Sequence, residues 1–264
     1  MAGTTTAERG GHQRESSGPP PVRRLGRQHL RLIIILAVAL VFLGSGAFWL
    51  LYGSDLARAE RVSVSGTRVL SPGQVREVAD VPLGGPLAMV DTEAIASRLR
   101  KEMPRIGTVD VIRSWPHEIR LEITERTPVL LMEKGGEFIE IDAEGVRYAT
   151  VSKAPRGVPR LELTVRRSGT TAASLRRFGE ARLVREAVRV VRDVPDPVAR
   201  ATRSVNVRTH DDISLKLTDG REVVWGSAEK GAAKGRTLTA LLKAAPGARH
   251  FDVSVPTAPA SSGG

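Results

Sequence analysis

The longest uninterrupted apolar stretch of the chain runs from Leu32 to Tyr52 and contains no charged residue. At about 1.5 Å per residue, a helix of this length can cross the roughly 30 Å hydrocarbon core of a bilayer. No other stretch of the sequence resembles it. We therefore predict one transmembrane helix over residues 32–52.

The residues on either side of this span predict its orientation. The first 31 residues carry six arginines against two glutamates, and short arginine-rich segments remain in the cytoplasm. Trp49 and Tyr52 lie at the other end, where aromatic rings favour the membrane interface. We expect residues from Gly53 onward to lie outside the cytoplasm. Anionic lipid headgroups would hold the arginines nearest the span, namely Arg23, Arg24, Arg27 and Arg31.

A cleavable signal peptide is the alternative for this segment, because Ala57-Arg58-Ala59 resembles a small-x-small cleavage site. The apolar run is longer than the roughly 7 to 15 residues of a signal peptide, which favours the membrane anchor. Residues 1–31 are rich in glycine and proline and lack apolar periodicity, so they are interpreted as a disordered basic tail.

Strand and helix signals follow one another through residues 57–126. Alternation in Arg61–Ser65, Thr108–Arg113 and Ile119–Thr124 predicts three strands. Ser71, followed by proline and then Gln74, has the pattern of a capping box and starts a helix to about Ala79. Asp91 caps a second helix, Thr92–Glu102, which ends before Pro104. The predicted order is strand, helix, helix, strand, strand, with the last two strands forming a hairpin.

Residues 127–255 are predicted to form a β-rich domain with flanking helices. Strands are expected at Val129–Met132, at 138–146 around an Asp-x-x-Gly turn, and on either side of Asp219-Gly220. Ser227 is expected to cap a later helix. The segment 256–264 contains proline and small residues, and we expect a disordered tail there.

The segment Ser174–Val191 places its apolar residues on one helical face and most of its arginines elsewhere. Packing of this face against the sheet is the favoured interpretation. A basic amphipathic helix lying on a membrane is the alternative. Gly179 inside the helix would cost about 1 kcal/mol relative to alanine, so the helix would depend on tertiary packing.

Composition and charge exclude several classes of function. The formal net charge is +11, of which residues 53–264 carry +7 after the tail's +4 is subtracted, and this charge is spread along the chain. The absence of cysteine excludes disulfides, thiol nucleophiles and cysteine metal sites. The five histidines lie outside any recognisable triad motif, and His210 with Asp211-Asp212 has the pattern of an ordinary loop. We expect no enzyme activity, no cofactor, no metal and no nucleic-acid partner.

A family resemblance becomes visible at residues 113–128. The pattern Arg113-x-Trp115-Pro116, three alternating apolar strand positions, then Glu125-Arg126-x-Pro128, outside a single amino-terminal anchor, resembles the hairpin signature of the bacterial cell-division proteins FtsQ and DivIB. The order of elements before it resembles a POTRA domain. The resemblance covers roughly residues 32–256, although Leu130 and Met132 depart from the family's small-then-aromatic pattern. It implies an α+β fold: a single-pass membrane helix, a POTRA domain and a β-rich domain.

The resemblance also implies a function. The family is a non-enzymatic scaffold of the divisome that binds the small bitopic proteins FtsL and FtsB, the latter also called DivIC, and links early division proteins to septal peptidoglycan synthases. The same resemblance implies a location at the division septum. An export or envelope-assembly protein with a POTRA domain is the alternative, although such proteins usually carry several POTRA copies or a barrel.

The terminal strand is the natural docking place for such a partner, because an unpaired edge offers backbone groups to a new strand. We expect this edge at Arg249–Val255, with Phe251, Val253 and Val255 on one face. The other face would carry His250, Asp252 and Ser254. In the hairpin, we expect Trp115 to be largely packed and Pro116 to shape the turn.

Overall fold

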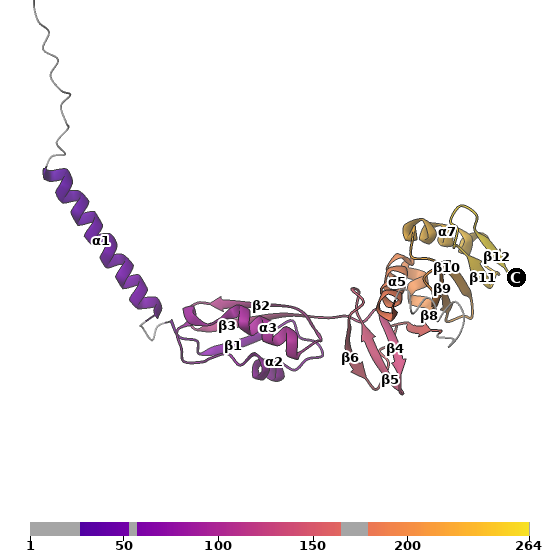
Figure 1. Ribbon diagram of the computed structural model, residues 1–264, viewed down its shortest axis with the longest axis horizontal. Coiled ribbons are helices and arrows are strands. Elements are labelled where there is room, and N and C mark those ends of the chain that lie inside the picture. Colours follow the sequence, from indigo (N-terminus) through magenta and orange to yellow (C-terminus); the bar gives the residue numbers. More distant parts are fainter. Residues whose placement is uncertain (1–26, 53–56, 165–178, 264) are drawn as a thin grey trace, which may run out of the picture. The chain divides into compact units, whose positions relative to one another are not determined.

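The computed structural model describes residues 27–52, 57–164 and 179–263 (Figure 1). Helix α1, Arg27–Tyr52, contains the predicted span and begins five residues earlier than expected. Within it, His29–Trp49 is long and apolar enough to cross a membrane, and none of it is buried in the protein. Apolar side chains exposed over this length need a nonaqueous environment.

The first lobe after the span has the predicted order β-α-α-β-β, which the structure confirms (Figure 1). Its sheet consists of β1 (Arg61–Ser65), β2 (Ile106–Ser114) and β3 (Glu118–Glu125). The strand order is β1-β3-β2, with β1 parallel and β2 antiparallel to the central β3. The chain therefore enters this lobe beside Glu118 and leaves it at Glu125, at the opposite end of β3.

Two capped helices cover this sheet. Helix α2, Pro72–Ala79, starts where Ser71 accepts the N–H of Gly73, and α3, Thr92–Glu102, starts where Asp91 accepts the N–H of Ala94. Both starts were predicted from the capping residues. A 3₁₀ turn, η2 (Leu87–Met89), separates the helices. Apolar side chains from the helices and the sheet form one core, which includes Val75, Leu87, Ile95, Leu99, Ile119 and Leu121.

The second lobe is built on a single sheet of nine strands in the order β12-β11-β10-β9-β8-β7-β4-β5-β6. Its first half contains β4 (Leu130–Lys134), β5 (Glu137–Ile141), β6 (Arg147–Val151) and β7 (Arg160–Leu163). Its second half contains β8 (Thr202–Thr209), β9 (Asp212–Leu217), β10 (Glu222–Gly226), β11 (His250–Asp252) and β12 (Ala260–Ser262). The sheet edges are β12 and β6.

Within the described part of the chain, three helices flank this sheet: α5 (Glu180–Asp193), α6 (Asp196–Ala201) and α7 (Gly231–Ala244). The apolar face of α5 lies in the same buried core as Leu215, Trp225 and Phe251 of the sheet. This confirms packing of the amphipathic helix on the sheet. A Cβ added at Gly235 would come within 2.8 Å of the Asp193 backbone oxygen, so glycine permits the close approach of α7 to the end of α5.

The structure corrects two predicted helix starts. Gly179 does not lie inside α5 but precedes it, at a positive φ of 69° that glycine adopts without strain. The expected beginning at Ser174 lies outside the described residues. Ser227 does not cap α7: its hydroxyl accepts the N–H of Glu229, and the helix begins after Lys230. A serine hydroxyl accepts whichever backbone N–H lies within reach in its own turn. Ser227 therefore closes a turn ahead of the helix and does not cap α7.

Candidate functional site

The carboxyl-terminal edge of the nine-stranded sheet differs from the predicted one. Strand β11 pairs in parallel with β10 through Glu222↔His250 and in antiparallel fashion with β12 through His250↔Ser262. The segment Arg249–Val255 is therefore not an edge, because β11 has a neighbour on both sides. The predicted disordered tail at 256–264 is also wrong, since Ala260–Ser262 is the terminal strand.

The faces of the predicted edge are corrected as well. Phe251 and Val253 are fully buried in the core of the sheet, whereas Val255 is exposed beyond the end of β11. Phe251 therefore stabilises the fold and is inaccessible to a partner. His250 remains exposed, 3.6 Å from Glu222, and Asp252 accepts the N–H of Ser254.

Strand β12 is the open edge on this side, and all three of its residues are exposed. Ala260, Ser261 and Ser262 are small and uncharged, so the strand offers mainly its backbone N–H and C=O groups. The return loop is held by Thr237 of α7, which donates to the Pro256 carbonyl, and by Arg249, whose N–H donates to the Ser262 carbonyl. These contacts place a preformed strand beside β11.

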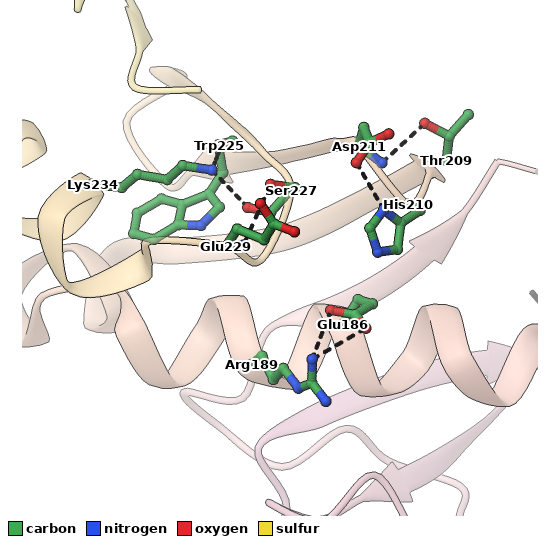
Figure 2. A network of polar contacts seen from close by, with 9 residues as sticks. All are labelled: Glu186, Arg189, Thr209, His210, Asp211, Trp225, Ser227, Glu229 and Lys234. Atoms are coloured by element: carbon green, nitrogen blue, oxygen red, sulfur yellow. Dashed lines mark hydrogen bonds and ion pairs between the residues drawn. The ribbon is translucent and has the colours of Figure 1, made fainter. Parts of the chain in front are cut away.

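A buried lysine supports this end of the sheet (Figure 2). Lys234 of α7 is 2% exposed, and its ammonium group donates to the carbonyls of Trp225, at 2.9 Å, and Ser227, at 2.8 Å. Burial lowers the pKa of Lys234. The lysine thus joins α7 to the carboxyl end of β10, the strand that carries β11. No pattern in the sequence distinguished it from the surface lysines.

The polar residues near His210 make a surface loop (Figure 2). His210 lies 2.7 Å from Asp211, and Asp212 begins β9 and pairs with Arg208 at 3.3 Å. Among the residues that the structure describes, no group of three or more His, Asp or Glu side chains could hold a metal ion.

The residues of the hairpin signature lie in the first lobe, except Pro128, which follows it. Arg113 donates to the Val90 carbonyl at 2.6 Å and ties β2 to the loop before α3. Trp115, at 49% exposure, is not packed as predicted and lies in the turn between β2 and β3. The Trp115–Pro116 peptide bond is cis. Pro128 lines an apolar cavity of about 220 Å³ at the start of β4.

Glu125 has the most connected side chain of the signature. Its carboxylate accepts the backbone N–H groups of Arg68, Val69 and Leu70 at 2.7 to 3.1 Å. Burial raises the pKa of Glu125, but these three bonds and Arg105 outweigh it and hold the pKa below the ordinary value. Glu125 therefore anchors the loop between β1 and α2 to the end of β3.

Two arginines connect the lobes. Arg105 lies 2.9 Å from Glu140 of β5 and over the Tyr148 ring, and Arg126 pairs with the buried Asp142. Burial, followed by the charge of Glu140, raises the pKa of Tyr148, which keeps this phenol protonated.

The predicted membrane-anchoring residues are only partly described. Arg23 and Arg24 lie outside the described residues. Arg27 begins α1, Arg31 lies within its first turns, and Tyr52 ends it. Trp49, near the far end of the helix, is exposed.

The POTRA domain and the full length of the chain both match known proteins. Residues 57–126 match the model of the POTRA domain, FtsQ-type, so the chain carries a POTRA domain ahead of its nine-stranded sheet. The chain is 66% identical over 263 residues to the cell division protein FtsQ of Streptomyces collinus, with all of both chains covered. The FtsQ of Mycobacteroides abscessus is 31% identical, over 96% of this chain and 76% of the relative. The chain belongs to the FtsQ family of cell division proteins.

A solved structure shows a more distant similarity. The major extracytoplasmic domain of DivIB from Geobacillus stearothermophilus is 16% identical, with a TM-score of 0.32. The alignment covers 46% of this chain and 94% of that domain.

Proposed function

We propose that this protein is a non-enzymatic, single-pass scaffold of the divisome that captures an FtsB/DivIC-like partner by adding the partner's strand to β12. FtsL-like proteins would join the same assembly, which links early division proteins to septal peptidoglycan synthases at the septum. The exposed β12 edge is the observation that supports this proposal most directly.

Edge chemistry favours β12 over the opposite edge of the sheet. In β6, Arg147 is engaged with Glu180 at 2.5 Å and Tyr148 is buried, and charged side chains on an edge discourage further pairing. In β12, the side chains are small and uncharged. An incoming strand can therefore approach the β12 backbone without displacing an ion pair.

Membrane anchoring is part of the same proposal. Ala57 and Ala59, the small residues of the possible cleavage site, are buried in the POTRA domain. Ala59 donates its N–H to the Gly85 carbonyl at 2.9 Å and accepts the N–H of Gly84 at 2.8 Å. Cleavage after Ala59 would remove these contacts from the fold, which supports a retained anchor.

The test measures binding of an FtsB-like partner to the full chain in detergent. Truncation after Pro259 removes β12, and Ser261→Pro disrupts its backbone. Both changes should weaken binding at least about tenfold, since each lost ladder bond is worth roughly 0.5 to 1.5 kcal/mol. Ser262→Ala is the matched control: it keeps the backbone and should bind normally. Unchanged affinity in both disrupted variants would overturn strand addition at β12.

A further inference from the structure

Three large apolar side chains are exposed on the POTRA domain at the end where the chain enters it. Leu83 is 58% exposed, Met89 is 70% exposed and Trp115 is 49% exposed. The first two belong to the loop between α2 and α3, and Trp115 belongs to the β2–β3 turn. None of these residues belongs to the nine-stranded sheet or to the proposed binding edge at β12.

Hydrogen bonds bring these two segments to one end of the domain. The loop is held by the Ala59 bonds to Gly84 and Gly85. The turn is held by Glu60, whose N–H donates to the His117 carbonyl at 2.8 Å. Because residues 59 and 60 are consecutive, the loop and the turn both lie beside this one short segment of the chain. We call this part of the domain, comprising residues 58–60, 83–90 and 113–118, the hairpin end.

A short tether joins the hairpin end to the predicted membrane span. Only six residue steps separate Tyr52, where α1 ends, from Arg58, which bridges to Pro86. Six steps of extended chain span at most about 22 Å. A tether of this length allows the loop and the turn to reach the lipid headgroups.

The chemistry of the hairpin end fits a lipid interface. The loop sequence from Val81 to Val90 has no charged residue, and its large exposed side chains are a leucine and a methionine. Indole rings favour the headgroup region. Arg58 and Arg113 of the hairpin end balance Glu60 and Glu118, and Arg61 and Arg120 border it, where they can meet anionic headgroups.

We propose that the hairpin end is a membrane-contact surface, with Leu83, Met89 and Trp115 inserted at the interface of an anionic bilayer. The POTRA domain then has a second, noncovalent attachment to the membrane beside its transmembrane helix. This attachment restricts the domain's orientation on the bilayer surface. The inference rests on the proposed membrane anchoring, so the experiment measures the anchoring and the membrane contact separately.

The experiment uses the full chain in nanodiscs of anionic lipid brominated in the upper acyl chain, which quenches tryptophan on contact. The chain has three tryptophans, and Trp225 is fully buried in the other lobe. In the Trp115→Phe variant, quenching of Trp49 reports anchoring. In the Trp49→Phe variant, quenching reports Trp115, and the double variant Trp49→Phe/Trp115→Phe supplies the Trp225 background.

We expect quenching in Trp49→Phe to exceed that of the double variant, with a blue-shifted Trp115 emission. Adding Leu83→Ser and Met89→Ser should abolish the difference. Val69→Ser is the matched control, since Val69 is 69% exposed but lies at the Glu125 end of the domain. Equal quenching in Trp49→Phe and the double variant, while Trp49 is still quenched in Trp115→Phe, would overturn the membrane contact. Loss of Trp49 quenching would contradict the anchoring and, with it, this inference.

Discussion

At the scale of single residues, Glu125 shows how one side chain closes the POTRA domain. Its carboxylate binds three consecutive backbone N–H groups in the loop that follows β1. A carboxylate accepting several N–H bonds is stabilised in its charged form. In the sequence, Glu125 is recognisable only as part of the hairpin signature. Its bonds to Arg68, Val69 and Leu70 join residues that are far apart in the sequence, so only the fold reveals them.

Replacing Glu125 with glutamine should lower the free energy of unfolding by about 1.5 to 3 kcal/mol at pH 7, because hydrogen bonds to a charged acceptor are lost. The folded-state pKa of Glu125 is depressed below its ordinary value of 4.5. Its contribution to stability is therefore present above that value and is lost as pH falls through the folded pKa. Urea midpoints at pH 7 and pH 3 measure this. The exposed Glu122→Gln is the control, and a Glu125→Gln midpoint equal to wild type at pH 7 would contradict the role.

Trp115 is a second residue whose role the structure changes. Because its indole is half exposed, Trp115→Ala should alter the free energy of unfolding by less than about 1 kcal/mol. Ile119→Ala, which truncates a fully buried side chain three residues after Pro116, should cost about 2 to 5 kcal/mol. Thermal or urea unfolding of the two variants compares them directly. A large loss for Trp115→Ala would show that the indole is packed after all.

At the scale of elements, Lys234 couples α7 to the end of β10. Removing its ammonium group leaves the Trp225 and Ser227 carbonyls without their donor, and each unsatisfied buried group costs about 1 to 3 kcal/mol. Release of a buried charge offsets part of this cost. We expect Lys234→Met to lose about 2 kcal/mol and to increase amide exchange in β10 and β11. Arg236→Met, an exposed change on the same helix, should show neither effect. Unchanged amide exchange in β11 would show that Lys234 does not stabilise the terminal strands.

At the scale of the whole molecule, the chain combines an apolar helix, a POTRA domain and a nine-stranded sheet. Arg105 and Arg126 of the POTRA domain contact Glu140 and Asp142 of the next lobe. Buried ion pairs of this kind add little net stability once the cost of desolvating both charges is counted. The proposed binding edge at β12 thus belongs to a sheet that is joined to the POTRA domain by charged contacts.

The anchored architecture makes a topological prediction. Protease added to spheroplasts should digest residues 53–264 and spare the amino-terminal tail, because we expect the arginine-rich flank to stay in the cytoplasm. Immunoblots with tags at each terminus measure this, and permeabilised cells supply the control. A soluble product beginning at Glu60 would instead establish signal cleavage after Ala59.

Local patterns in the sequence predicted the elements that depend on nearby residues. The Asp91 cap and the Pro104 stop bounded α3, and alternation located β2 and β3. The apolar span and the hairpin signature led to the family that the comparisons show. Each of these signals arises from contacts within a few residues or from the composition of one segment, so it can be recognised without a fold.

Tertiary structure alone decided which strand is the edge and which side chains are accessible. Ala260–Ser262 has low intrinsic strand preference and becomes a strand because β11 supplies its hydrogen-bonding partners. That pairing places β11 inside the sheet and Phe251 in the core, and so moves the proposed docking site to β12. The bonds of Glu125 and Lys234 likewise join segments brought together only by folding. The pairing of two distant segments leaves no periodic pattern in the sequence of either segment. The sequence therefore determined the family and the local helices and strands. The fold determined which strand is an edge and which side chains are exposed.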